Sequence, residues 1–199
     1  MAAMGMPIAV YLPRFYSEGM GLSLVTVGTV FFIARIWDVV TDPIMGIMID
    51  KFDSRWGRRK HWIALSIPIL LLSVWMVFMP DPEDVSGFYL MFWLILLYVG
   101  YTMLAISHQS WGVELSKSYD DRSRLFGWRE IFVIGGMAVV LAIPAAMELT
   151  GHSEQATKVA SMGWFCLILF PLLAIPTLLW VPDSHNKRGV TIPWREAFK

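Results

Sequence analysis

The sequence predicts an all-α membrane protein whose chain crosses the bilayer several times. Hydrophobic residues make up 56% of its 199 residues, whereas charged residues make up 16%. This balance, with 10 tryptophans, is typical of polytopic membrane proteins and not of soluble enzymes. Several apolar runs reach the roughly 20 residues that a helix needs to span the hydrocarbon core. None alternates apolar and polar residues as a half-buried strand would.

Six apolar segments divide the chain, and we expect each to be helical. They cover about residues 1–12, 24–49, 62–79, 88–110, 131–147 and 161–181. The first is too short to span a bilayer at about 1.5 Å per residue, so we expect the surviving end of a longer, truncated helix. Residues 1–181 are interpreted as one transmembrane bundle, and residues 182–199 as a cytoplasmic tail or the start of a central loop. A single cysteine, Cys166, excludes an internal disulfide.

Positive charges lie in alternate loops and predict the orientation. They gather in 51–60, 117–129 and 187–199, whereas the loop at 81–84 is acidic. Because cytoplasmic loops carry the excess of lysine and arginine, we expect a multi-pass protein of the plasma (inner) membrane with both termini in the cytoplasm. Four tryptophans near the predicted helix ends are interpreted as residues of the interfacial belt: Trp62, Trp111, Trp128 and Trp180.

The segment 24–49 carries Arg35, Asp38 and Asp42 at membrane depth. A charge there costs between about 3 and more than about 10 kcal/mol, so its presence indicates an internal, hydrated or ion-filled site. Asp38 and Asp42 are four residues apart and share one helix face, roughly 6 Å from each other. Two carboxylates suit a hard monovalent cation or a proton, and Arg35, one turn earlier, can pair with Asp38 when the site is empty. The alternative is a structural ion pair with Arg35.

Two motifs at characteristic spacing identify a family. They are carried by Gly21–Ser23, Val27–Thr29, Ala34–Asp38, Thr41–Gly46, Asp50 and Ser54–Lys60. This block closely resembles the glycoside-pentoside-hexuronide:cation symporters, the melibiose permease branch of the major facilitator superfamily. Gly46 with Asp50 and the Gly57-Arg58-Arg59 run also resembles the general signature of the loop between helices two and three of that superfamily. The resemblance implies the amino-terminal six-helix bundle of a major facilitator fold.

The resemblance implies roles for individual residues. Asp38 and Asp42 match the two cation-site aspartates of the family, Thr41 matches a position that influences cation preference, and Thr102 matches a fourth-helix hydroxyl near the ion. Arg129 matches a fifth-helix arginine associated with sugar binding.

Three departures from the family pattern argue against recognition of galactosides. Ala2 and Ala105 stand where melibiose-type members place sugar-binding aspartates, and Gln109 replaces an aromatic residue. The neighbouring His108 and Gln109 are candidates for reading a different substrate, or else the polar end of a helix that returns to water.

A second charged group surrounds the loop after residue 49. Arg58 and Arg59, with Asp50 and Glu114, are candidates for a cytoplasmic gate latch. In the alternative interpretation the arginines only fix topology next to lipid, and both interpretations can hold together. His61, His152 and His185 have no second ligand at metal-like spacing, so we expect no metal centre beyond a possible sodium ion at Asp38 and Asp42.

These observations predict cation-coupled symport, driven by sodium or protons, of a sugar, glycoside or related solute by alternating access. The expected partners are the small-molecule solute, the lipid bilayer, and a carboxy-terminal six-helix half or second copy, with no cofactor and no nucleic acid. Membrane aspartyl proteases also use paired aspartates, but theirs lie on facing helices, so we expect no enzyme activity. The alternative is a truncated half-transporter without autonomous activity that requires a partner half.

Overall fold

The computed structural model describes residues 5–52, 54, 57–116, 118–149, 151 and 154–182. Its elements are α1 (Gly5–Arg14), a π-helical turn η2 (Phe15–Gly19), α2 (Leu24–Lys51), α3 (Lys60–Phe78), α4 (Gly87–Leu115), α5 (Tyr119–Leu149) and α6 (Gln155–Trp180). The predicted all-α membrane fold is confirmed. Five helices, α2 to α6, are long and apolar enough to cross a membrane. The 10-residue α1 is too short to do so, so six membrane-spanning helices are not established for the described residues.

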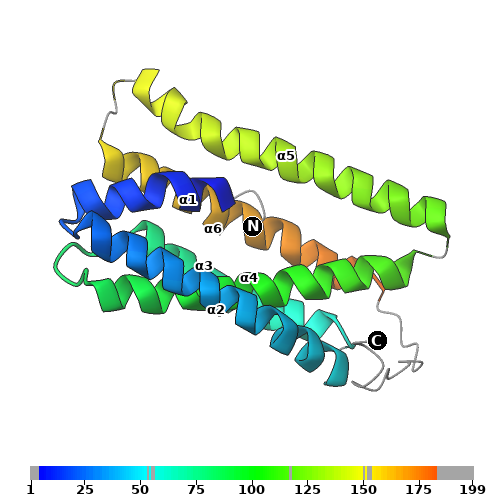
Figure 1. Ribbon diagram of the computed structural model, residues 1–199. Coiled ribbons are helices and arrows are strands. Elements are labelled where there is room, and N and C mark those ends of the chain that lie inside the picture. The colour runs from blue at the N-terminus through cyan, green and yellow to red at the C-terminus, as the bar shows by residue number, and fades with distance from the viewer. Residues whose placement is uncertain are drawn as a thin grey trace.

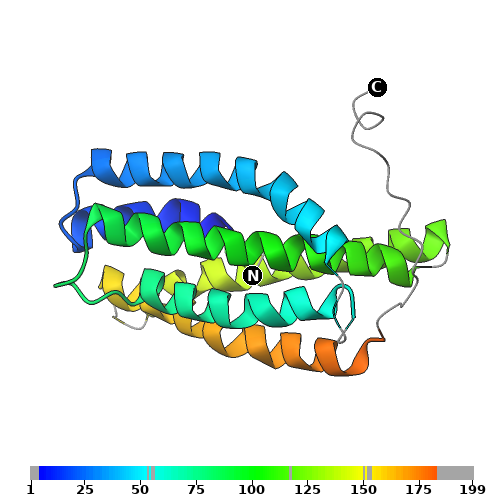
Figure 2. The same cartoon turned by 90° about the horizontal axis from the view of Figure 1, so that it is seen from below.

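The long helices lie side by side and run along one common direction (Figures 1 and 2). α4 packs most extensively against α2 and α3, and α3 also packs against α6. α5 lies at one side and buries only Val140 and Pro144. We call the end that carries Arg59 and Arg124 the basic end, and the end that carries residues 81–84 the acidic end. α1 covers only the part of the bundle next to the acidic end (Figure 1).

Hydroxyl groups fix the helix ends at the acidic end. Ser23 and Ser86 cap α2 and α4 by accepting hydrogen bonds from the backbone N–H groups of Thr26 and Tyr89, at 3.0 and 3.1 Å. α3 ends just before Pro80, which has no N–H to offer to the Met76 carbonyl. Tyr89 donates its hydroxyl to that carbonyl at 2.9 Å instead. In the same way Tyr16 donates to the neighbouring Val77 carbonyl at 2.9 Å, which ties η2 and α4 to α3.

The helices at the basic end are longer than the apolar runs predict. α4 continues to Leu115 rather than ending near residue 110, and α5 begins at Tyr119 rather than near residue 131. The first turns of α5 contain charged residues for two reasons. Ser118 caps the helix by accepting a hydrogen bond from the backbone N–H of Asp121 at 3.1 Å. Acidic side chains such as those in the first turn are also favourable at a helix N-terminus. An apolar window marks only the membrane-buried part of such a helix.

Two of the four predicted belt tryptophans are core residues instead. Trp62 of α3 is 8% exposed and Trp111 of α4 is 2% exposed, and Trp62 belongs to a buried cluster with Met45, Ile49 and Met103. Trp128 and Trp180 remain 62% and 83% exposed, as belt residues would be. The predicted tail, Ala2, and two of the loop histidines, His152 and His185, lie outside the described residues.

Candidate functional site

The crossing of α2 and α4 brings three predicted cation-site residues together. Thr102 on α4 places its hydroxyl oxygen 2.8 Å from Asp42 Oδ1 and 3.3 Å from Asp38 Oδ1. Asp38 and Thr102 are buried, at 7% and 3% exposure, whereas Asp42 is exposed. A hydroxyl has one hydrogen, so it cannot satisfy both carboxylates at once. The two aspartates are therefore held close to each other with one shared donor between them.

Arg35 supplies a positive charge next to the two aspartates. Its Nη1 lies 2.9 Å from Asp38 Oδ2, and its side chain is 71% exposed, so the ion pair reaches from the buried carboxylate to the surface of α2. One arginine against two carboxylates leaves one negative charge uncompensated. A bound monovalent cation would cancel that charge and supply the contacts that the single hydroxyl cannot. The residues of the site thus fit sodium or a proton better than a divalent ion.

The fourth predicted cation-site residue has a different orientation. The Thr41 hydroxyl donates to carbonyls of its own helix, Trp37 O at 3.0 Å and Asp38 O at 3.2 Å, and does not bond to either carboxylate. This is the common way for a threonine to satisfy its hydroxyl within a helix. Its influence on cation preference stays a prediction. Next to Asp42, Pro43 has no N–H for the Val39 carbonyl, which leaves a backbone oxygen without its helical donor at this level of α2.

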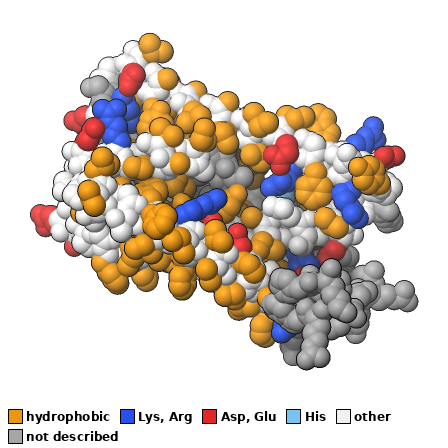
Figure 3. All heavy atoms as spheres, in the orientation of Figure 1, with side chains coloured by type: hydrophobic (Ala, Val, Ile, Leu, Met, Phe, Trp, Pro, Cys, Tyr) orange, Lys and Arg blue, Asp and Glu red, His pale blue; other side chains and the backbone are white. Residues whose placement is uncertain are grey.

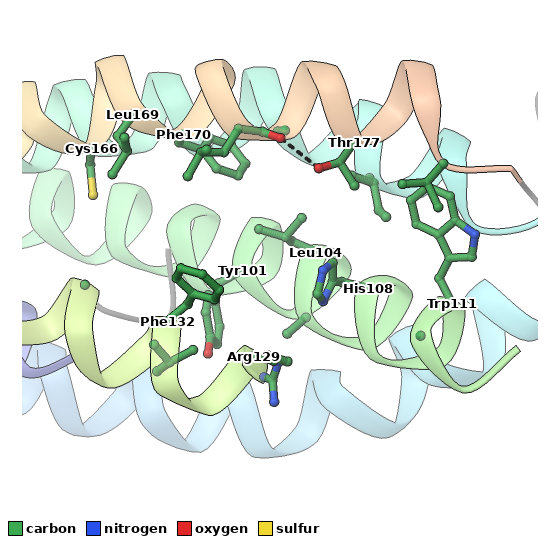
Figure 4. Close-up of a pocket in the computed structure, with 18 of the residues that line it drawn as sticks. Tyr101, Leu104, His108, Trp111, Arg129, Phe132, Cys166, Leu169, Phe170 and Thr177 are labelled. Atoms are coloured by element: carbon green, nitrogen blue, oxygen red, sulfur yellow. Dashed lines mark hydrogen bonds between the residues drawn. The ribbon is translucent and has the colours of Figure 1, made fainter. Parts of the chain in front are cut away.

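A second site lies on the other side of α4. A cavity of about 650 Å³ that is open on one side is lined by α4, α5 and α6, together with Ile63 of α3. His108 and Tyr101 line it from α4, and Arg129 lines it from α5 (Figure 4). The structure therefore brings together two of the three predicted substrate-binding residues. The third, Gln109, is exposed and does not line the cavity.

α4 is the wall that the two sites share. Thr102 meets the aspartates of α2, whereas the preceding Tyr101 lines the cavity between α4, α5 and α6. Successive helical residues point about 100° apart, so neighbouring positions on one helix can serve sites on different sides. A displacement of α4 would alter both sites together.

The predicted latch residues meet at the basic end. Arg59, with a side chain that is 6% exposed, places Nη2 2.9 Å from Asp50 Oδ1 and 3.1 Å from Glu114 Oε1. Arg58 donates from Nη2 to the Asp50 carbonyl at 3.1 Å. Arg59 thereby joins the end of α2, the start of α3 and the end of α4. The structure places these four residues together, and their gating role stays a prediction.

Sequence reasoning missed three contacts that join helices or their ends. Trp111 donates from Nε1 to Pro182 O at 3.2 Å, and Lys60 Nζ lies 5.7 Å from the centre of its ring. At the acidic end, Lys158 of α6 pairs with Glu148 of α5. No spacing rule signals contacts between residues that distant helices bring together, and the position of Trp111 near a predicted helix end favoured the interfacial interpretation.

Comparison with known proteins places the chain in a family. A family model described as MFS/sugar transport protein matches residues 1–198. The isoprimeverose transporter of Lactiplantibacillus pentosus is 27% identical over 188 residues, which cover 92% of this chain and 38% of that protein. The uncharacterized symporter sll1374 of Synechocystis sp. is 28% identical over 189 residues, which cover 90% of this chain and 34% of that protein.

The putative glycoside/cation symporter YagG of Escherichia coli K12 is 27% identical over 161 residues, which cover 79% of this chain and 34% of YagG. The chain thus spans 34–38% of the length of these curated relatives. The expected resemblance is confirmed by both kinds of comparison. With its five long apolar helices, the chain is a multi-pass membrane protein and belongs to the MFS/sugar transport protein family.

Proposed function

We propose that this chain is the cation-binding half of a symporter that couples sodium or protons to the uptake of a sugar, glycoside or related solute across the plasma membrane. The observation that carries the proposal is the arrangement of Asp38, Asp42 and Thr102, in which two carboxylates converge on one hydroxyl at 3.3 and 2.8 Å. The names of two relatives, an isoprimeverose transporter and a putative glycoside/cation symporter, support the solute class. In this proposal the two aspartates and Thr102 serve membrane transport and not enzyme catalysis.

The surface of α2 supports the need for a second half. Figure 3 shows basic and acidic side chains together near the middle of a largely hydrophobic face. On α2, the Arg35 side chain is 71% exposed, and Asp42 is also exposed. Large apolar residues of the same helix, such as Phe32 and Val39, are exposed as well. Ionised groups at this depth do not face lipid. A carboxy-terminal six-helix half or a second copy therefore covers α2 and closes the solute pathway, and the chain alone does not transport.

The mechanism is alternating access. Cation binding at Asp38 and Asp42 neutralises the uncompensated charge. It also holds Thr102 in place, and thereby the position of α4 relative to α2. The solute binds in the cavity lined by His108 and Arg129, on the opposite side of the same helix. Rocking of this bundle against its partner half then exposes both sites to the other side of the membrane. The cluster around Arg59 latches the basic end in one of the two states.

Binding of the coupling cation by the chain in lipid nanodiscs tests the proposal. Calorimetric titration with sodium chloride at about pH 8, and proton uptake followed with a pH indicator, compare the wild type with the variant that carries both Asp38→Asn and Asp42→Asn. The proposal expects one saturable cation-binding event that the double variant lacks. Titration with potassium chloride controls for ionic strength. Unchanged sodium and proton binding in the double variant would refute the assignment.

A further inference from the structure

The cavity between α4, α5 and α6 has a lining that is poorly suited to reading a sugar ring. Each sugar hydroxyl both donates and accepts, so a site that reads several of them needs several acceptors at fixed positions. Carboxylates and carboxamides usually supply them. The described residues that line the cavity include no aspartate, glutamate, asparagine or glutamine.

Two of the polar side chains in the lining are already engaged. The Thr177 hydroxyl donates to Leu173 O at 2.8 Å, a bond drawn in Figure 4, and the Trp111 indole N–H donates to Pro182 O at 3.2 Å. The groups that remain for a ligand are the Tyr101 hydroxyl, the His108 ring and the Arg129 guanidinium. All three are able to donate hydrogen bonds, and one is a permanent cation.

Arg129 keeps most of its binding capacity. Its Nη1 pairs with Glu130 Oε1 at 2.7 Å, but the Glu130 side chain is 57% exposed, so water screens that pair. The Arg129 side chain itself is only 24% exposed. A guanidinium offers five N–H donors in a planar fork that matches a carboxylate or sulfonate in bidentate geometry. His108 of α4 lines the same cavity as Arg129 and adds a further donor or acceptor (Figure 4).

The rest of the cavity is apolar. Phe165, Leu169 and Phe170 of α6 line it, and Figure 4 shows Leu169 and Phe170 on the helix opposite Phe132 of α5. Its volume of about 650 Å³ is in the range of sites for compact organic ligands, which are mostly apolar with a few polar groups that fix orientation. A few polar groups among mostly apolar walls define the chemistry of the ligand.

We propose that the ligand of this cavity is an amphiphilic organic anion, with one acid group held by Arg129 and His108 and an apolar body of aromatic size packed between α5 and α6. This inference rests on the proposed function: of the solutes named there, it selects a related, anionic solute over a sugar or glycoside for the same site. Recognition comes from one charge and apolar contact, and not from a set of sugar hydroxyls.

Cys166 provides the test, because it lines the cavity and is the single cysteine of the chain. The rate of its alkylation by N-ethylmaleimide is measured by mass spectrometry on the 199-residue chain in lipid nanodiscs. The probes are 1-naphthaleneacetate, its neutral amide of the same shape, acetate and phenyl β-D-glucoside. We expect the naphthalene acid to protect Cys166 at a concentration at least about tenfold lower than the amide, because a charged hydrogen bond is lost in the amide. Acetate and the glucoside should protect weakly.

Two matched variants separate the role of Arg129 from a general effect of charge. Arg129→Gln should bring the protecting concentrations of the acid and the amide within about twofold of each other. Arg124→Gln removes an equally charged residue of α5 that is exposed and does not line the cavity, and should preserve the difference. The comparison of acid with amide on the wild type needs no variant, so a folding defect in Arg129→Gln does not compromise it.

Equal protection by the acid and the amide would overturn the inference, as would stronger protection by the glucoside than by the acid. The proposed function fails on a different readout, since cation binding at Asp38 and Asp42 is measured without any organic ligand.

Discussion

Replacing Arg59 with methionine tests how the basic end of the bundle is held together. Arg59 is 5% exposed and bonds to two carboxylates from other helices, Asp50 at 2.9 Å and Glu114 at 3.1 Å. Methionine keeps much of the side-chain volume and removes the charge. The change therefore reports on the ion pairs more than on packing.

The structure sets the size of the expected effect. Removing one partner of a buried ion pair destabilises by about 3–5 kcal/mol. Three features reduce that figure here. The side chains of Asp50 and Glu114 are 61% and 25% exposed, so water can solvate the carboxylates that lose their partner. Arg59 Nη1 is buried with no hydrogen-bond partner among the described residues, so the substitution also removes an unfavourable group. We expect a loss of about 2 kcal/mol in the free energy of unfolding.

Reversible denaturation of the chain in mixed micelles, followed by circular dichroism, measures that loss. Arg124→Met is the matched control, and because Arg124 is exposed its effect should stay within about 0.5 kcal/mol. A double-mutant cycle with Glu114→Gln should give a coupling energy of about 1 kcal/mol between residues 59 and 114. Equal destabilisation by Arg59→Met and Arg124→Met, or a coupling energy near zero, would refute the view that this cluster ties three helices together.

Two further predictions concern the cation site and the topology. Thr102→Val should weaken binding of the coupling cation by about tenfold, because the carboxylates lose their shared hydroxyl. Thr29→Val should leave affinity unchanged, since that hydroxyl donates to Val25 O of its own helix; similar calorimetric affinities for both variants would contradict the site. Reporter fusions in 50–60 and in the tail at 182–199 should report cytoplasm and fusions in 80–87 the outside, and the reverse pattern would overturn the orientation.

The sequence predicts the membrane fold and the proximity of Arg35, Asp38 and Asp42 because both follow from local rules. Helices must satisfy their own backbone groups in lipid, so apolar length alone locates α2 to α6. Asp38 and Asp42 are four residues apart on one helix, so their proximity is fixed by helical geometry. Arg35 lies within the same turn, and its pairing with Asp38 at 2.9 Å matches the expectation.

What the sequence could not predict depends on packing between distant helices. Trp111 is buried and its bond to Pro182 joins the end of α4 to the segment just after α6. The exclusion of Gln109 from the cavity depends on the rotation of α4, which a single sequence does not reveal. The start of α5 at Tyr119 follows from capping by Ser118, and a capping serine thirteen residues before the predicted apolar run carries no hydropathy signal.

Uptake in proteoliposomes tests the central claim most directly, namely that the aspartate pair of α2 couples a cation gradient to solute movement. The chain is reconstituted alone and joined to a carboxy-terminal six-helix half, with sodium and pH gradients imposed separately against a panel of labelled solutes. The account predicts concentrative uptake by the joined form under one of the two gradients, its loss in Asp42→Asn with membrane insertion intact, and none by the chain alone. Normal accumulation by the Asp42→Asn form would contradict it.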